Sequence, residues 1–131
     1  MDSGIHVIRD LSQGFASRGD AIASGALVDL SGLFPDVCER HYPGFGVACS
    51  ALVWQRIEQA TEAPYLFNDL PGVVSQVLSA SRLAQVSEVD DFTRIFLVLL
   101  ATFGRAEHLR LHWAPGDRDE PTVTITLPEE V

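Results

Sequence analysis

Two runs of strictly alternating apolar and polar residues in the C-terminal third limit the possible folds most. The apolar members are Leu109, Leu111 and Trp113 in the first run and Val123, Ile125 and Leu127 in the second. Alternation with a period of two is typical of a strand that buries one face. Pro115-Gly116-Asp117 lies between the runs and is a turn signal, because Gly tolerates positive φ and Pro presets φ at about −65°. Residues 107–127 therefore predict a β-hairpin.

The segments before the hairpin predict a mixture of helices and strands. Residues 92–103 are apolar and rich in β-branched and aromatic residues, which favours a central strand covered on both faces, with a helix as the alternative. Apolar residues at helical spacing predict helices over 33–41, 51–62 and 70–84, capped by Ser31, by Ser50, and by Asn68 or Asp69. We expect a short helix around 20–23, an extended segment at 25–31, an apolar entry to the second helix at 45–49, and an acidic linker at 87–91.

Together these elements predict one α+β domain over residues 1–131. Its sheet would be a three-stranded antiparallel meander formed by 92–103 and the hairpin, with two or three helices packed on one face. Residues 1–19 would be a loosely ordered arm, because glycines and serines interrupt any longer pattern there.

The charge balance narrows the possible partners. The chain has 18 acidic residues against nine Arg, has no Lys, and carries a net charge of −9. Such a chain should be repelled by nucleic-acid backbones and by anionic membranes, but it suits a basic protein surface, including one that normally holds nucleic acid. The acids are spread along the sequence, a distribution that solubility alone also explains. We see no secretory signal and no apolar run near the roughly 20 residues that span a bilayer, so we expect a cytoplasmic protein.

The sequence contains one weak metal pattern and no recognisable catalytic one. Cys38 and His41 share a predicted helix face and Cys49 follows, but a structural zinc site needs four ligands, and a cysteine near a core is usually a small buried hydrophobe. Cys38 and His41 lack an orienting third group for nucleophilic catalysis, and a chain without Lys has no P-loop. We therefore expect no metal, no cofactor and no enzymatic activity, and we expect free buried thiols.

Two surfaces are candidates for contacting a protein partner. The first is the polar strip His108, Arg110 and His112, which should face Thr122, Thr124 and Thr126 across the hairpin. The two histidines are about 13 Å apart along a strand, too far to share one metal ion. The second is an acidic patch of Asp117, Asp119 and Glu120. For the strip, the alternative is an ordinary solvated sheet face. Trp54 and Trp113 are either core residues or, in one case, a half-exposed interface anchor.

Several stretches together resemble an uncharacterised family of small bacterial proteins carried on plasmids and integrative elements. They are residues 21–31 (AIASGALVDLS), 35–41 (PDVCERH), 47–54 (VACSALVW), 115–117 (PGD) and 120–129 (EPTVTITLPE), with Asn68-Asp69 and 72–74 (GVV). The resemblance covers roughly residues 20–130. The arm departs from it, since the family opens with a Tyr-rich segment where this chain has Phe15-Ala-Ser-Arg-Gly19.

The resemblance implies a genomic context and no catalytic residues. Small acidic proteins of mobile elements often protect the element by occluding restriction or CRISPR complexes. We therefore expect a non-enzymatic, protein-binding accessory factor of a mobile genetic element that inhibits a host defence complex, as an anti-CRISPR or antirestriction protein does. The alternatives are a small-molecule or metal-binding accessory domain that uses Cys38, His41 and Cys49, and a self-associating module, such as a homodimer, whose Thr-rich last strand pairs with its copy.

Overall fold

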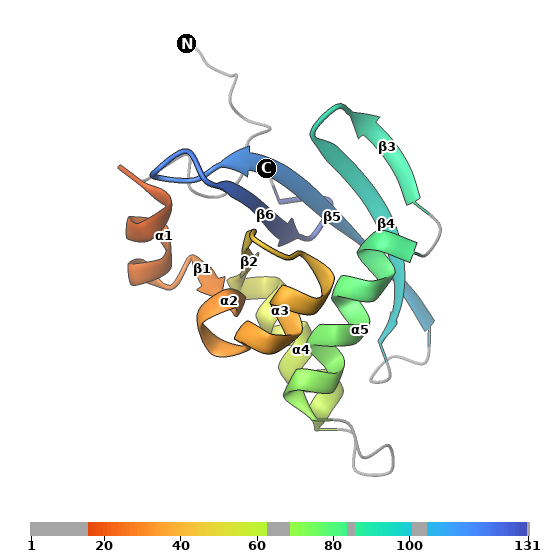
Figure 1. Cartoon of the computed structure of the whole chain (residues 1–131). Coiled ribbons are helices and arrows are strands. Elements are labelled where there is room, and N and C mark those ends of the chain that lie inside the picture. The colour runs from red at the N-terminus through yellow and green to blue at the C-terminus, as the bar shows by residue number, and fades with distance from the viewer. Residues whose placement is uncertain (1–15, 63–68, 84–85, 101–104, 131) are drawn as a thin grey trace.

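The computed structural model describes residues 16–62, 69–83, 86–100 and 105–130, which form a mixed six-stranded sheet and five helices (Figure 1). The strands, in the spatial order β1-β2-β6-β5-β4-β3, are β1 (Leu27–Asp29), β2 (Gly46–Ser50), β6 (Pro121–Thr126), β5 (Arg105–Pro115), β4 (Thr93–Leu100) and β3 (Val86–Asp90). The helices are α1 (Arg18–Ser24), α2 (Leu30–Leu33), α3 (Pro35–His41), α4 (Ala51–Thr61) and α5 (Leu70–Leu83).

The predicted hairpin is confirmed as β5 and β6. These strands are antiparallel, with Leu111 opposite Ile125 and Trp113 opposite Val123. The predicted strand over 92–103 is β4, which runs antiparallel to β5 and completes the meander. Its last predicted residues, 101–103, lie outside the described part of the chain.

The prediction of a three-stranded antiparallel sheet is wrong, because three further strands extend the meander on both sides. β2 lies parallel to β6, with Val47 opposite Val123, and β1 is antiparallel to β2. We predicted that residues 45–49 lead into a helix, because a short apolar run does not distinguish a buried strand from a buried helical segment. Since β6 lies between β2 and β5, it is not an edge, which removes the basis for pairing two copies through the last strand.

The expected acidic linker at 87–91 is also wrong. Residues 86–90 form β3, an edge strand that pairs only with β4 among the described strands and has a register shift between Glu88 and Asp90. Its acidic residues suggested a loop, but charged residues and bulges are also common on edge strands, where they oppose pairing with another chain.

The predicted helix over 33–41 is broken in two at Phe34. This residue precedes Pro35 and has φ −134° and ψ 64°, because a proline ring disfavours helical backbone in the residue before it. Ser31 therefore does not cap this helix: it lies within α2, and its hydroxyl accepts a hydrogen bond of 2.7 Å from the backbone N–H of Val47 in β2.

The other helix predictions are confirmed where the structure describes them. Ser50 caps α4 by accepting a hydrogen bond from Val53, and Asp69 Oδ1 accepts one from Gly72 at 2.8 Å in the first turn of α5. Asn68, Ala84 and most of the expected arm lie outside the described residues. The short helix expected around 20–23 is α1, which ends at Gly25 with φ 89°, a left-handed conformation that favours glycine.

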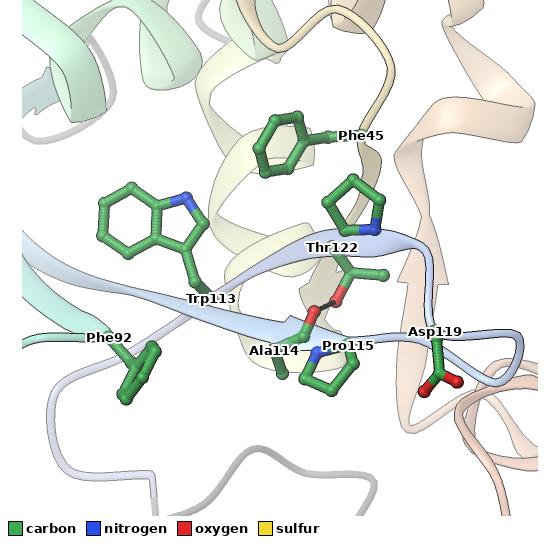
Figure 2. A pocket seen from close by; sticks show the side chains of 8 residues that line it. Phe45, Phe92, Trp113, Ala114, Pro115, Asp119 and Thr122 are labelled. Atoms are coloured by element: carbon green, nitrogen blue, oxygen red, sulfur yellow. Dashed lines mark hydrogen bonds between the residues drawn. The ribbon is translucent and has the colours of Figure 1, made fainter.

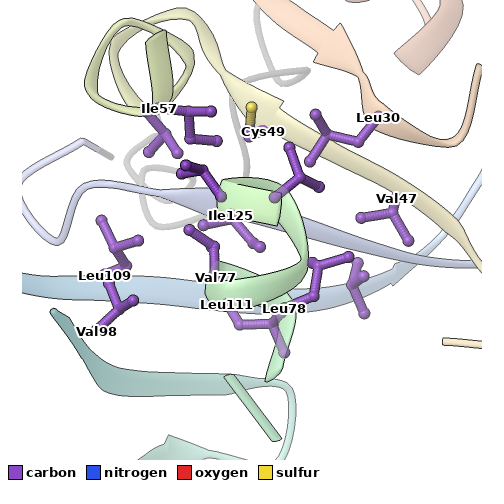
Figure 3. Close-up of a cluster of buried hydrophobic side chains, with 14 of the residues drawn as sticks. Leu30, Val47, Cys49, Ile57, Val77, Leu78, Val98, Leu109, Leu111 and Ile125 are labelled. Atoms are coloured by element: carbon purple, nitrogen blue, oxygen red, sulfur yellow. The ribbon is translucent and has the colours of Figure 1, made fainter. Parts of the chain in front are cut away.

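The main core lies between the sheet and the layer of α2 to α5 (Figure 1). Aliphatic side chains from both layers fill it, including Ile57 and Leu78 from helices and Leu111 and Ile125 from the hairpin (Figure 3). α1 packs apart from this layer, with Ala21 against Leu27 and Ala48 in a second cluster. Successive strand residues point to opposite faces, so α1 covers the other face of the sheet. None of the described helices has the length and apolar character needed to cross a bilayer.

Candidate functional site

A cleft of about 420 Å³ lies at the end of the sheet where the β5–β6 hairpin turns. Five rings line it, those of Phe45, Phe92, Trp113, Pro115 and Pro121. The other lining residues are Ala114, Thr122 and Asp119, which supplies a carboxylate. Figure 2 shows Phe45 and Trp113 on one side of the hairpin strands and Phe92 and Asp119 on the other. We call this surface the hairpin cleft.

Phe45 is positioned by the turn between α3 and β2. Gly44 has φ 82°, a conformation that side-chain-bearing residues rarely adopt, and its N–H donates to the Glu39 carboxylate at 3.0 Å. The Phe45 N–H bonds to the carbonyl of Tyr42 at 3.1 Å, and the rings of Tyr42 and Phe45 meet edge to face with centroids 5.9 Å apart. The buried Tyr42 thus anchors the ring that forms one wall of the cleft.

Phe92 is positioned by the β3–β4 turn and remains 60% exposed. Asp90 Oδ1 accepts a hydrogen bond from the Phe92 N–H at 2.8 Å, as in an Asx turn. The Phe92 carbonyl accepts a hydrogen bond from the Trp113 N–H at 2.8 Å. The first bond fixes the turn and the second joins it to β5, so the aromatic residues from the turn and the hairpin keep a fixed spacing.

Trp113 is half-buried and packs against the main core. The guanidinium carbon of Arg94, on the neighbouring strand β4, lies 4.6 Å from the centroid of the indole ring. An arginine over an aromatic face is held by the ring quadrupole and by dispersion. This residue fits the half-exposed anchor that the sequence allowed for one tryptophan, whereas Trp54 packs against Phe34 on the helical layer with ring centroids 6.3 Å apart.

Asp119 lies in the β5–β6 loop with φ 60°, a left-handed conformation that aspartate tolerates better than most residues. The loop is closed by two backbone hydrogen bonds, from Gly116 to Glu120 at 2.7 Å and from Asp119 to Gly116 at 3.1 Å. Beside the loop, Thr122 Oγ1 of β6 donates a hydrogen bond of 2.8 Å to the Ala114 carbonyl of β5. The backbone that carries Asp119 is therefore fixed by the loop, and its side chain lines the cleft.

The cleft is apolar with exposed carboxylates at its border. Asp119 lines it, and Asp90 and Asp91 immediately precede Phe92 in the turn that supplies its ring. The hydrogen bond from the Phe92 N–H lowers the pKa of Asp90, so this carboxylate is ionised at neutral pH. An aromatic surface bordered by fixed negative charge suits an occupant that is apolar and cationic.

The predicted acidic patch does occur in one loop, but its members have different contacts. Asp117 accepts hydrogen bonds from the backbone N–H groups of Arg18 and Gly19, at 2.8 and 2.9 Å. Glu120 accepts one from the Arg118 N–H at 2.8 Å. Only Asp119 lines the hairpin cleft. Asp117 thus serves the attachment of α1, and Asp119 is the member best placed to meet a partner.

The predicted strip of His108, Arg110 and His112 lies on the sheet face that α1 also covers. Arg110 is opposite Thr126 and His112 opposite Thr124, as expected. His108 is exposed, whereas Arg110 and the three threonines are buried, and His112 is within 3.0 Å of the Thr93 hydroxyl. Arg18 donates to Thr124 Oγ1 at 2.6 Å on this face. A role for the strip in partner binding stays a prediction.

The structure does not bring Cys38, His41 and Cys49 together as ligands. Both cysteines are free and buried in the core, and burial raises the pKa of Cys38 to about 11 and that of Cys49 as well. His41 Nε2 instead lies 2.9 Å from Ser75 Oγ of α5. Within the described ranges, no three His, Cys, Asp or Glu side chains converge as metal ligands.

The His41–Ser75 contact has the residue types of a nucleophile and its base. Burial and the charges of Arg40 and Arg82 lower the pKa of His41, so the imidazole is neutral at physiological pH. A serine nucleophile also requires oxyanion donors and a group that orients the histidine. The charges that lower the pKa of His41 come from two cations, neither of which can orient the imidazole as a carboxylate would. We interpret the contact as a link between α3 and α5.

Comparisons of the chain with protein-family models, with curated proteins and with solved structures find no match. The candidate site therefore depends on the geometry of this chain alone. The sequence indicated Asp119 and Trp113, but it did not identify Phe45 or Phe92. The signal available for Phe92 was a large aromatic residue directly after the two acids that end the predicted linker, at the start of the predicted strand.

Proposed function

We propose that the protein is a non-enzymatic binding protein that holds a basic protein partner at the hairpin cleft. The observation that carries this proposal is the combination of five rings and a lining carboxylate in one cleft. Interface anchors are most often aromatic or arginine residues that fill such pockets. The net charge of −9 would steer a basic partner towards the protein.

The exposed position of Phe92 supports this proposal. An aromatic side chain that is 60% exposed leaves apolar surface in contact with water, and Val89 in the preceding strand is 61% exposed. Large apolar patches with a polar rim are typical of interaction surfaces. Here the rim is acidic, with Asp90 and Asp91 in the same turn, so the complementary surface would be apolar at its centre and basic at its edge.

The resemblance to proteins of mobile elements suggests the class of partner. We propose that it is the basic, nucleic-acid-holding surface of a host defence complex, which an acidic protein would occlude. Co-expression with CRISPR interference or with a restriction system measures this directly. Restored plasmid transformation would support the proposal, and unchanged interference across both kinds of system would remove this choice of partner while leaving the binding site to be tested.

Site-specific photo-crosslinking tests the binding site itself. A benzophenone amino acid would replace Phe92 at the cleft or, as a matched control, Leu52, an apolar residue of α4 that is 45% exposed. In bacterial lysate, we expect a covalent adduct with a basic protein from position 92, weaker at high salt because screening reduces the charge attraction. Adducts of equal yield from both positions, or none from position 92, would contradict the proposal.

A small organic molecule is the second candidate occupant. The volume of about 420 Å³ is within the range of roughly 300–1,000 Å³ that is typical of ligand sites. The lining is mostly apolar with few polar groups, which is also typical of such sites. A small ligand would compete with the adduct at position 92 and would be recovered by mass spectrometry from protein purified under native conditions.

A further inference from the structure

We infer that the anchor a partner places in the hairpin cleft is an arginine side chain. This inference rests on the proposed function and names the chemistry of the occupant. An arginine has an apolar stem of three methylene groups and a planar cationic head, so one side chain satisfies both an apolar lining and a carboxylate. The cleft offers the two surfaces side by side, with rings along its length and Asp119 at the hairpin loop.

The rings are arranged along the hairpin in the order that such a side chain requires. Figure 2 shows Phe92, Pro115 and Asp119 on the same side of the hairpin strands. In that view Pro115 lies between Phe92 and Asp119 along the hairpin. A stem lying over Phe92 and Pro115 would therefore bring its guanidinium group to the Asp119 carboxylate, where two parallel N–H···O bonds can form.

The protein already packs one of its own arginines in this way. The Arg94 guanidinium carbon is 4.6 Å from the Trp113 ring centroid, so this indole already has a guanidinium stacked on it. The exposed ring that is left for an arginine from a partner is that of Phe92. Lysine would be attracted by the same charges, but its compact ammonium group is more strongly hydrated and does not stack. The stacking and the carboxylate together favour arginine over lysine.

Fixed charge at the border adds to the preference for a cation. Asp90 and Asp91 are exposed in the turn that carries Phe92, and the bond from the Phe92 N–H holds Asp90 in place. Arg118 is the one cation of the hairpin loop, beside the acids Asp117, Asp119 and Glu120. The loop and the turn therefore present more negative than positive charge to whatever enters the cleft.

The test uses Trp113 as a reporter. The chain has two tryptophans, so the full-length variant Trp54→Phe leaves fluorescence only from the cleft. Capped pentapeptides of alanine with a central arginine, citrulline, lysine or leucine are titrated against it. Citrulline has nearly the shape of arginine without its charge. We expect arginine to bind about tenfold or more tightly than citrulline, the factor that one charge-assisted hydrogen bond supplies, with lysine in between.

Two charge-removing substitutions locate the contact. Asp119→Asn removes the carboxylate and keeps a residue type that tolerates φ 60°, so we expect the advantage of arginine over citrulline to disappear. Glu58→Gln removes an equal charge from the exposed surface of α4 and should leave the advantage unchanged. Circular dichroism of each variant verifies the fold.

The outcomes distinguish this inference from the proposed function. Equal affinity for arginine and citrulline, tighter binding of leucine, or an arginine advantage that survives Asp119→Asn would each overturn the inference. If no peptide binds but position 92 still crosslinks to a basic protein, the anchor is not arginine and the proposed function stands. If both experiments are negative, both proposals are wrong.

Discussion

The side chain of Asp117 and the backbone of Arg18 are joined by a hydrogen bond of 2.8 Å, although the two residues are 99 positions apart in the sequence. The second carboxylate oxygen of Asp117 accepts the Gly19 N–H at 2.9 Å. The Arg18 guanidinium group adds two hydrogen bonds to β6, because it donates to Thr124 Oγ1 and to the Val123 carbonyl. The hairpin that forms the cleft on one side therefore also holds the first turn of α1.

Replacing Asp117 should release α1 without unfolding the sheet. Asp117→Ala removes both acceptors for the first amide groups of α1, so we expect faster hydrogen exchange in residues 18–24 and unchanged exchange in β5 and β6. Asp119→Asn, in the same loop, is the control and should leave α1 protected. Hydrogen exchange measured by mass spectrometry tests this prediction. Slow exchange of α1 in Asp117→Ala would show that Asp117 does not hold the helix.

The same contact predicts a pH dependence. The N–H groups of Gly19 and Arg18 lower the pKa of Asp117 below its ordinary value. A lowered pKa means that the stabilisation is fully present above the ordinary pKa of about 4 and is lost as the pH falls through the folded-state pKa. The protection factors of the α1 amides, which correct for the slower intrinsic exchange at low pH, should therefore fall on acidification in the wild type and change little in Asp117→Ala.

Ser50 links the C-terminus to α4, which gives a prediction about stability. Its buried hydroxyl accepts the Val53 N–H at 3.2 Å and donates to Glu130 Oε1 at 2.7 Å. Glu130 also accepts the Leu127 N–H at 2.8 Å. Ser50→Ala should lower the free energy of unfolding by about 1–3 kcal/mol, since it removes an N-cap and a buried hydrogen bond.

Chemical denaturation measures this loss, and Glu130→Gln is the matched control. The amide oxygen of Gln can still accept from Ser50 and Leu127, so the control should lose less than Ser50→Ala. Equal unfolding midpoints for wild type and Ser50→Ala would show that the cap contributes nothing.

The successes of the sequence predictions all depend on local signals. The alternation around Leu111 and Ile125, the turn at Pro115 and the cap at Ser50 are each encoded within a few residues, and each is confirmed. The acids of the loop were likewise identified as neighbours because the loop itself brings them together.

The errors over β1 and β2 concern contacts between distant segments. β2 is a strand because β6 and β1 pair with it. A five-residue apolar run contains no information about which strands will pair with it. The cleft depends on the same long-range order, since Phe45 and Trp113 line one cleft only when β2 lies beside the hairpin. No spacing within the sequence relates these two aromatic residues.

Both cysteines should resist modification in the folded protein. Burial raises the pKa of Cys38 to about 11 and raises that of Cys49 further, so almost no reactive thiolate exists at pH 8. We expect an aromatic disulfide reagent to react slowly with native protein and rapidly with both thiols after denaturation. Fast reaction of one thiol in the native state would show that Cys38 or Cys49 is accessible, and single Cys→Ala variants would identify which.

Phe92 should matter for binding far more than for folding. Its side chain is 60% exposed, so Phe92→Ala should change the free energy of unfolding by less than about 1 kcal/mol. If Phe92 is an anchor of the interface, the same substitution should weaken binding of the crosslinked partner by about 2 kcal/mol or more. Denaturation and calorimetric titration measure the two effects on one variant.

Leu52→Ala provides the comparison that makes this result specific to the cleft. Leu52 is 45% exposed on α4 and does not line the cleft, so its loss should leave partner binding within about 0.5 kcal/mol of wild type. Phe45→Ala should weaken both binding and stability, because Phe45 also packs against Tyr42 and the core. A Phe92→Ala variant that binds as tightly as Leu52→Ala would show that the partner does not use this cleft.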